Sequence, residues 1–326
     1  MAHSIKYLFN LLRKLGLFVA LFSLPMQVAW ANNALVIRGA SSAFEEVVNG
    51  MNDDLEGEVT LHEIIVTKKS SQKEIVKAFK QHNPDIVILV GNKAVNLYGQ
   101  FQNKNPKDSY PPAIAMAALF VDKFVGKLKN ATAIRYEIPA VTSVVAMRSI
   151  LGKPVKKVGV VYREWMEDII KENQRYCKTE GIELVGIKLP NKSGKVDSKV
   201  RDALKSLSND VDALWILNDN ALLTRDALLK AWLPSRGKSK LPAIVGIRQF
   251  MTKIPLGSFA IVPDNYGLGA QAAGMIFDAM DNDWELEETD VQQPVSVKKF
   301  INVATLSKKS IGYRTDKLSQ VDEVVK

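Results

Sequence analysis

The sequence predicts an α/β protein of two lobes, each a doubly wound parallel sheet with helices on both faces, and a ligand cleft between the lobes. From residue 34 onward, short apolar runs of strand length alternate with longer amphipathic stretches of helix length, which is the pattern of βα units. The same pattern starts again at Pro139, so the chain carries two similar halves. Its 326 residues exceed a usual single domain and suit two.

The first 31 residues have the features of a secretory signal. Positive charge comes first, from Lys6, Arg13 and Lys14, and no acidic residue precedes Glu45. An apolar run of about ten residues follows, roughly half of what a membrane-spanning helix needs. Ala29-Trp30-Ala31 then offers the small-x-small pattern of a cleavage site. We therefore expect export and cleavage after Ala31, in preference to a retained membrane anchor.

Strands and helices alternate through the first half of the exported chain. The run Pro84–Val90 is largely β-branched and apolar, as expected of a parallel strand covered on both faces. Ser71 and Glu74 form a capping-box pattern that opens a helix. The other predicted strands are Ala34–Ile37, Val59–Val66, Ala113–Leu119 and Thr132–Tyr136, and the other predicted helices are Ser42–Leu55 and Lys93–Gln102.

The second half repeats the alternation. Gly181 follows a long amphipathic helix, at a position where a left-handed cap is common. The predicted helices are Pro139–Leu151, Glu164–Glu180, Val196–Leu207, Ala221–Leu233 and Tyr266–Met280. The predicted strands are Lys157–Val161, Ile182–Ile187, Ala213–Leu217, Ala243–Gly246, Phe259–Val262 and Val295–Val303.

Composition and motifs argue against several function classes. The net charge of +9 is spread along the chain, which indicates a solvated surface and no nucleic-acid partner. Cys177 is the only cysteine, and His62 and His82 supply neither a base positioned for its thiol nor a zinc-ligand spacing. The stretch 267–272 matches G-x-G-x-x-A, but small residues packing a helix on a sheet explain it better than a dinucleotide site. We expect no enzymatic activity, no cofactor and no metal.

Ligand contacts are expected just beyond the carboxyl ends of the strands, where helix N-termini leave N–H groups free. Ser41, Ser42 and Asn92 follow strands and start helices, so helix capping competes with ligand binding there. Three aromatic side chains also lie near strand ends: Tyr136, Tyr162 and Trp165. Each could stack on a ligand or pack within the protein, and for Trp165 ordinary packing is favoured.

Five stretches carry a resemblance to a known family: Lys156–Tyr162, Gly181–Val185, Asp212–Asn220, Val262–Gln271 and the tail from Phe300 to Val325. In order and spacing they resemble the ABC-transporter substrate-binding proteins of the type I periplasmic-binding fold, the group with tryptophan- and other aromatic amino-acid-binding members. The resemblance is good from about Pro154 to the end and weaker before it.

The resemblance implies a periplasmic protein that binds a small molecule by lobe closure and presents it to an ABC permease in the inner membrane; we expect a monomer. It would place residues 32–138 and 262–288 in the N-terminal lobe, and 139–261 and 289–326 in the C-terminal lobe. It favours these ligand contacts: Asn218, Asp219, Asn220, Asp264 and Tyr266. Ala118–Lys123 stands where family members often carry Thr-Asp-Pro, so an aromatic amino-acid ligand cannot be assumed.

Six basic residues lie near the carboxyl ends of predicted strands: Arg38, Lys68, Lys93, Arg135, Arg163 and Arg248. A cleft lined by them would favour an anionic ligand, although chance is an alternative because the chain has 44 Lys and Arg. The sequence leaves the ligand open between anionic and amino-acid-like solutes. A sensory receptor with the same fold, docking on a signalling membrane protein, is the alternative to transport.

Overall fold

The computed structural model describes residues 32–107, 109–192, 194–286 and 290–326. The predicted signal, residues 1–31, and its cleavage site lie outside the described residues. Asn33–Lys326 form one compact unit. Within the described part of the chain, no helix combines the length and the apolar character that crossing a membrane requires. The predicted class, two parallel-dominated sheets with helices on both faces, is confirmed.

The first sheet has five strands in the order β2-β1-β3-β4-β5. β1 pairs in parallel with β3, β3 with β4, and β4 with β5. Every residue of β3 is buried, which fits its continuous apolar run and a strand covered on both faces. The strands are β1 (Asn32–Arg38), β2 (Val59–Ile65), β3 (Ile86–Val90), β4 (Ala113–Met116) and β5 (Ala131–Ala133).

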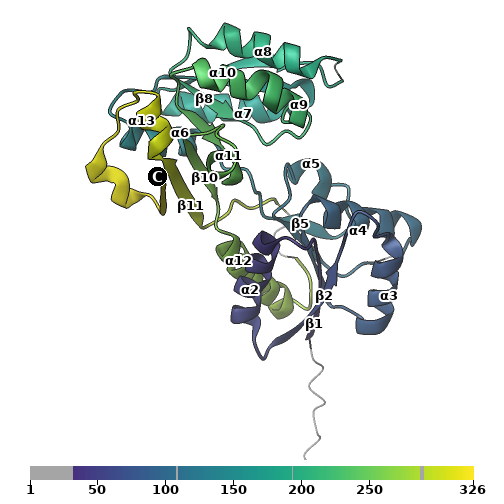
Figure 1. Ribbon diagram of the computed structural model, residues 1–326. Coiled ribbons are helices and arrows are strands. Elements are labelled where there is room, and N and C mark those ends of the chain that lie inside the picture. The colour runs from purple at the N-terminus through teal and green to yellow at the C-terminus, as the bar shows by residue number, and fades with distance from the viewer. Residues whose placement is uncertain (1–31, 108, 193, 287–289) are drawn as a thin grey trace, which may run out of the picture. The chain divides into compact units, whose positions relative to one another are not determined.

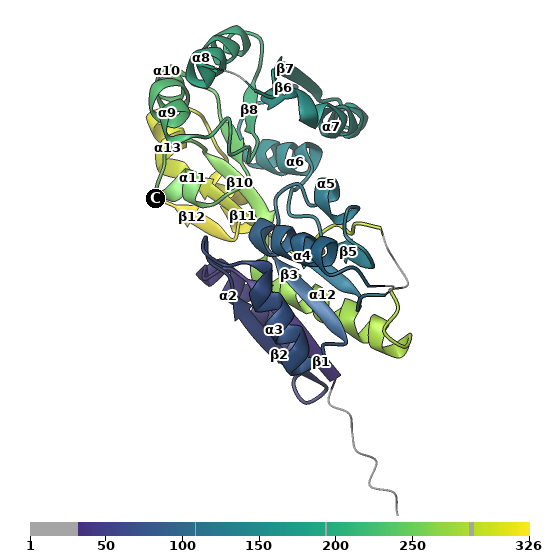
Figure 2. The ribbon, with the colours of Figure 1, turned by 90° about the vertical axis from the view of Figure 1, so that its right-hand side faces the viewer.

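Two groups of helices cover the two faces of this sheet. Alternate residues of β1 show the division, because side chains along a strand point to opposite faces. Ala34 and Val36 pack with α2 and α12, whereas Leu35 and Ile37 pack with α3, α4 and α5. Figure 2 looks onto the side with α3 and α4. The helices are α2 (Ser42–Leu55), α3 (Gln72–His82), α4 (Asn92–Lys104), α5 (Asp122–Val125) and α12 (Asn265–Asp281).

Side-chain caps fix where two of these helices begin. The Ser41 hydroxyl accepts the N–H of Ala43 at 3.3 Å and starts α2. The predicted capping box of α3 is confirmed, because the Ser71 N–H donates to Glu74 Oε2 at 2.8 Å and the Ser71 hydroxyl accepts from the first turn. Such caps satisfy N–H groups that the start of a helix leaves without partners.

The second sheet has seven strands in the order β12-β11-β10-β9-β8-β6-β7. From β6 to β10 the neighbouring strands pair in parallel, as predicted. β11 instead runs antiparallel to β10, with Val297 opposite Pro263, because the returning chain enters the sheet at the edge where β10 ends. The strands are β6 (Lys157–Arg163), β7 (Glu183–Leu189), β8 (Ala213–Ile216), β9 (Ala243–Val245), β10 (Phe259–Pro263), β11 (Val297–Asn302) and β12 (Glu323–Val325).

Helices cover both faces of this sheet too. On one face pack α6 (Ala140–Ile150), α7 (Glu167–Thr179) and α13 (Val303–Lys308). On the other pack α8 (Val196–Leu207), α9 (Arg225–Ala227), α11 (Gln249–Thr252) and a π-helical turn (Leu228–Trp232) that continues into α10 (Leu233–Lys238). Two 3₁₀ helices, Glu164–Met166 and Thr315–Gln320, precede α7 and β12.

Three predicted elements are wrong in extent. The predicted strand Thr132–Tyr136 corresponds to β5, which already ends at Ala133. The predicted strand Ala113–Leu119 ends at Met116, because Ala117 adopts a φ of +49° that a strand does not allow. The predicted helix Ala221–Leu233 begins only at Arg225, where the Thr224 hydroxyl accepts the N–H of Ala227 at 3.2 Å. The short helices α5, α11 and α13 were not predicted, since four to six residues are too few to show a helical period.

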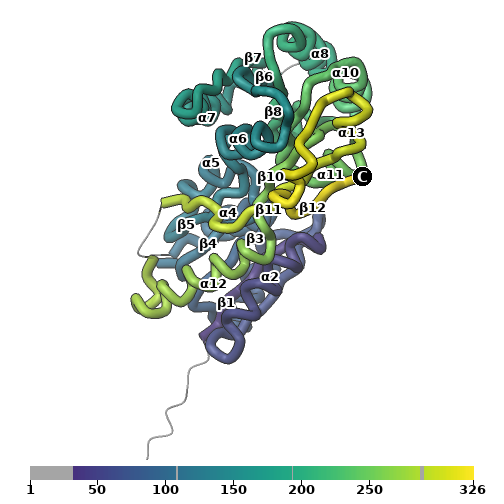
Figure 3. The backbone as a smooth tube through the Cα atoms, turned by 90° about the vertical axis from the view of Figure 1, so that its left-hand side faces the viewer, coloured from purple at the N-terminus to yellow at the C-terminus, as the bar shows by residue number. Residues whose placement is uncertain are grey.

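Helix α12 follows a strand of the second sheet but packs beside α2 on the first (Figure 1, Figure 3). The stretch after it also contacts the first sheet: the Gln292 N–H donates to the Ala133 carbonyl at 2.9 Å, and the Arg135 N–H donates to the Gln292 carbonyl at 2.8 Å. The proposed lobe boundaries, at residues 138/139, 261/262 and 288/289, stay a prediction.

Two glycines allow α2 and α12 to approach backbone to backbone. A Cβ on Gly269 would lie 2.0 Å from the Val47 carbonyl oxygen, and one on Gly50 would lie 2.1 Å from that of Tyr266. The glycine motif therefore packs α12 against another helix, α2, whereas the sequence predicted that it packs a helix against a sheet. Gly267 and Gly269 both lie inside α12, whereas a dinucleotide site needs them in the turn before the helix.

We expect Gly269→Ala to lower the free energy of unfolding by about 1–3 kcal/mol, the usual cost of overpacking a tight contact. Gly274→Ala, in the same helix with nothing within 4 Å of the added Cβ, is the matched control. It should raise stability by about 0.5–1 kcal/mol, because alanine favours a helix over glycine. Urea unfolding of both variants checks this, and equal effects would contradict the packing role of Gly269.

Candidate functional site

Two adjoining cavities lie where the connection from β5 to α6 meets the carboxyl end of β8. Both are lined by Glu137, Ile138, Trp215 and Leu217, and we call them together the junction site. The larger has a volume of about 280 Å³ and the smaller about 20 Å³. About 10–15 Å³ of such space holds one water molecule, so the smaller cavity has room for about one and the larger cavity has room for a small solute.

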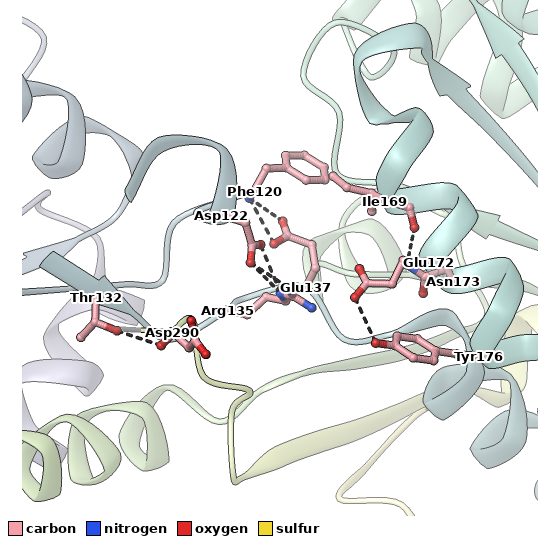
Figure 4. A network of polar contacts seen from close by, with 10 residues as sticks. All are labelled: Phe120, Asp122, Thr132, Arg135, Glu137, Ile169, Glu172, Asn173, Tyr176 and Asp290. Atoms are coloured by element: carbon pink, nitrogen blue, oxygen red, sulfur yellow. Dashed lines mark hydrogen bonds and ion pairs between the residues drawn. The ribbon is translucent and has the colours of Figure 1, made fainter. Parts of the chain in front are cut away.

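Glu137 is the acid at the centre of the junction site (Figure 4). Both of its carboxylate oxygens accept the N–H of Phe120, at 3.0 and 3.1 Å, which ties the loop after β4 to the β5–α6 connection. Burial, with a smaller contribution from Asp122, raises the pKa of Glu137 to about 7, although the hydrogen bonds and Arg135 lower it. The site therefore holds a carboxyl group that changes charge near neutral pH.

Charged pairs surround the larger cavity. Arg135 donates to Asp122 through two nitrogens, with Nη2–Oδ1 at 2.7 Å and Nε–Oδ2 at 3.1 Å. The Tyr176 hydroxyl donates to Glu172 Oε1 at 3.0 Å (Figure 4). The Arg135–Asp122 pair balances its own charge, whereas the Tyr176 hydroxyl leaves the negative charge of Glu172 in place. Lys123 and Arg175 also line the cavity.

Aromatic rings form much of the remaining wall. Phe120 lines the larger cavity, and its ring meets that of Trp165 edge to face, with centroids 5.0 Å apart. Trp215 lines both cavities and Tyr136 lines the smaller one. Burial raises the pKa of Tyr136 to about 12, with a further increase from Glu137, so its hydroxyl stays a neutral donor. Trp165 packs on Phe120, in line with the packing role that the sequence favoured.

Asn218 lines the smaller cavity and carries an unused acceptor. Its side chain is buried, and its Nδ2 donates to the Gly246 carbonyl at 3.3 Å. Its Oδ1 is buried and has no hydrogen-bond partner among the described residues. Because a buried acceptor without a donor costs about 1–3 kcal/mol, a ligand N–H or O–H would find a favourable place here.

Arg163 and Asp219, both predicted ligand contacts, bind each other. Arg163 Nε lies 2.6 Å from Asp219 Oδ2 and Nη2 lies 2.8 Å from Oδ1, a bidentate pair. The Asp219 side chain is 1% exposed and also accepts the N–H of Ala221. The pair joins the carboxyl ends of β6 and β8, and neither residue lines the junction site.

The arginines of the predicted basic set all have carboxylate partners. Besides Arg163 and Arg135, Arg38 pairs with Glu63 and Arg248 pairs with Glu323, in both cases at 2.5 Å. Lys68 and Lys93 are exposed. The sequence shows the cations but not the acids that the fold places beside them, so the anionic ligand stays a prediction that the geometry does not favour.

The other predicted contacts lie outside the junction site. Ser41 and Ser42 are exposed at the start of α2, and Asn220 is exposed after β8. Asn92 exchanges hydrogen bonds with the Leu119 backbone, with its Nδ2 donating at 2.8 Å and its Oδ1 accepting at 2.9 Å. It therefore holds the loop after β4 and does not cap α4.

Three further predicted residues are engaged elsewhere. The Tyr162 ring is buried against Gly186 and Ile170, because its position in β6 points it under α7. Asp264 pairs with Lys298 at 2.8 Å, and the exposed Tyr266 donates its hydroxyl to Asp53 at 2.7 Å. Tyr136 and Asn218, together with Arg135 of the basic set, are thus the predicted residues that line the junction site. Whether the others contact ligand stays a prediction.

Sequence reasoning missed Glu137, Phe120 and Trp215. Glu137 stands next to Tyr136 at a predicted strand end, so the same reasoning could have included it. Phe120 directly follows the predicted strand Ala113–Leu119, within the stretch Ala118–Lys123 that was marked only as a departure from the family pattern. Trp215 lies inside a strand, where an aromatic residue is expected to belong to the core.

Cys177 is buried, and the rings of His62 and His82 stack on each other with centroids 3.9 Å apart. Burial raises the pKa of the Cys177 thiol to about 11, which disfavours the reactive thiolate. Among residues 32–326 without the gaps given above, no group of three or more His, Cys, Asp or Glu is placed to hold a metal ion.

Comparison with known proteins gives one family and several solved structures. The family model described as ABC transporter substrate binding protein matches residues 41–325. A Streptococcus pneumoniae ABC domain in complex with L-Trp is 18% identical with a TM-score of 0.56, and the match covers 90% of this chain and 100% of that one. No curated protein matches the chain.

Two further structures share the fold. A ligand-free, open substrate-binding protein with adhesive properties from Clostridium difficile is 13% identical with a TM-score of 0.67. A conserved domain protein from Vibrio cholerae is 16% identical with a TM-score of 0.59. Each match covers 90% of this chain and 99% of the other.

Arg163→Ala should lower the free energy of unfolding by about 3 kcal/mol, because it leaves the buried Asp219 carboxylate without its partner. Arg248→Ala removes an arginine from a pair whose side chains are 47% and 39% exposed. It should cost less than about 1 kcal/mol. Chemical denaturation of the two variants measures the difference, and equal losses would contradict the distinct burial of the two pairs.

Glu137 should make the protein less stable as pH rises. In an unfolded chain a glutamate has a pKa of about 4.3, whereas burial holds that of Glu137 near 7 in the folded state. Between these values the folded state keeps a proton that the unfolded state releases, so the free energy of unfolding falls with pH across this window. Relative to Glu137→Gln, the wild type should lose about 2–3 kcal/mol from pH 4.5 to pH 8. Parallel stability curves for the two proteins in urea would contradict this.

Proposed function

Because this chain belongs to the ABC transporter substrate-binding protein family, we propose that it is the exported receptor of an ABC importer and that its ligand is a small, amine-bearing, amino-acid-like solute. The observation that carries the ligand class is the buried Asn218 Oδ1 without a donor among the described residues, in a side chain that lines the same small cavity as Glu137. Two acceptors in one small site favour a ligand that donates hydrogen bonds.

A protonated amine meets these requirements better than a carboxylate does. An ammonium group offers three donors and a positive charge, which suits both an ionised Glu137 and the faces of nearby aromatic rings. Trp215 and Tyr136 line the same cavity. A carboxylate would instead face an acid and an unpaired acceptor, because the arginines predicted to receive it are already paired.

Size and shape support a solute no larger than an aromatic amino acid. The larger cavity, of about 280 Å³, is walled by Phe120, Ile138, Trp215 and Leu217, which offer apolar surface for a ring or an aliphatic chain. One structural relative is in complex with L-Trp, which fits this ligand class.

The proposed mechanism is closure of the two lobes on the ligand, after which a membrane permease recognises the closed form. The ligand shifts the equilibrium by binding more tightly to the closed state. Glu137 lies on the connection between the two sheets and holds the Phe120 loop, so it can join ligand binding to that movement. The predicted signal supports a location outside the inner membrane.

A thermal-shift screen tests the ligand class. A ligand that binds the folded state stabilises it by mass action and so raises the melting temperature. At a ligand concentration of a hundred times Kd, the free energy of unfolding rises by about 2.7 kcal/mol. We expect L-amino acids with an apolar or aromatic side chain to raise it, and their deaminated carboxylic acid analogues to fail. If only the deaminated acids raise the melting temperature, the amine-bearing ligand class is wrong and the anionic alternative holds.

Asn218→Ala supplies the matched variant. Loss of one charged hydrogen bond should weaken the binding of the ligand found in the screen by about tenfold. Asn96→Ala, on the exposed face of α4, should leave binding unchanged. Calorimetric titration of both variants checks the assignment, and an unchanged Kd in Asn218→Ala would remove Asn218 from the site.

A further inference from the structure

A second cavity, of about 620 Å³, lies at the amino end of β8, where α8 and α10 end. Its charged lining consists only of cations: Arg201, Lys205, Arg236, Lys238 and Lys240. Leu214 of β8 lines this cavity, whereas Leu217 after the same strand lines the junction site, so the two sites lie at opposite edges of the sheet.

Arg236 lines this cavity and is only 2% exposed. Its Nε donates to the Leu256 carbonyl at 3.0 Å and its Nη2 to the Leu241 carbonyl at 2.7 Å. Its Nη1 is buried and has no hydrogen-bond partner in the described part of the chain. Burial lowers the pKa of Arg236 to about 10, which still leaves it charged at neutral pH. A buried cation held only by neutral carbonyls is an unfavourable arrangement without an anion.

Lys309 adds a second cation next to Arg236. Its ammonium donates to the carbonyl oxygens of Arg236 and Ser239, the latter at 2.7 Å. Burial lowers the pKa of Lys309 to about 8, with smaller decreases from Arg236 and Lys308. Like charges are therefore gathered here, although no carboxylate of the described residues pairs with either of them.

Helix ends explain only part of this charge. Lys205 and Lys238 stand in the last turns of α8 and α10, where cations complement the carbonyl end of a helix. Each helix end carries roughly half a negative charge, so two ends offset about one of the cations. Several positive charges remain, and they point to an anion as the missing partner.

We propose that this cavity binds a phosphate group, supplied either by a soluble phosphate compound or by the headgroup of an anionic phospholipid. A phosphate carries more than one negative charge and several acceptor oxygens. It therefore suits a cavity that is lined by the Arg236 guanidinium and by several lysines. A monovalent carboxylate would leave most of the cations without a partner. The inference is independent of the proposed function, because the two sites share no lining residue.

Titration of the purified protein, in the form that the cell makes, with inorganic phosphate at constant ionic strength tests the site. We expect binding that the double variant Lys205→Gln/Lys240→Gln weakens by about fivefold to tenfold, the effect of two exposed charged contacts. The control Lys77→Gln/Lys80→Gln removes the same charge from the exposed face of α3 and should bind like the wild type. Arg236→Met, if it folds, should abolish binding.

Vesicles distinguish the two sources of phosphate. Sedimentation with phosphatidylglycerol vesicles and not with phosphatidylcholine vesicles, lost in Lys205→Gln/Lys240→Gln, would assign the site to a lipid headgroup. Binding of inorganic phosphate without vesicle binding would assign it to a soluble compound. If neither probe binds, or if the double variant and the control bind equally well, the proposal is wrong.

Discussion

The backbone contact between α2 and α12 constrains the rest of the fold. The chain leaves the second sheet after β10, packs Leu268, Ala272 and Ile276 into the core of the first, and then returns as β11 beside β10. The first core is therefore incomplete until residues far along the sequence are present. Contacts of such large sequence separation are slow to form, because a long loop must close before they give any stabilisation. The two sheets are consequently parts of one unit that neither half of the sequence specifies alone.

The alternation of apolar and amphipathic stretches was enough to predict most elements and the fold class. Helices α2 and α8 begin and end at the predicted residues, because their apolar residues recur with the period of a helix over that range. The failures occur where local and tertiary preferences differ. Ala117 and Phe120 adopt positive φ angles that nothing in their side chains favours, so the loop after β4 could not be predicted. The direction of β11 also depends on where the chain returns, which no local pattern records.

The candidate site was only partly predictable for a different reason. Residue type and strand position identified Tyr136 and Asn218, and they also gathered arginines near strand ends. Each of those arginines, however, meets an acid from another part of the chain, as Arg163 meets Asp219 and Arg248 meets Glu323. The sequence shows which residues are charged. The charge that a ligand meets in a cleft is only that of the residues that have no oppositely charged partner in the fold. Glu137 is the reverse case, an acid that burial makes able to hold its proton near neutrality.

The sole cysteine has a practical consequence. Cys177 is a fully buried residue of α7, and a thiol with a pKa of about 11 is almost wholly protonated at neutral pH. Maleimide dyes react with exposed thiolates, so the folded protein should remain unlabelled by them. A cysteine introduced at the exposed position of Asn220 would then be the single attachment point for a fluorophore, without removal of the native thiol. The fold thus already provides the background that a reagentless optical sensor requires.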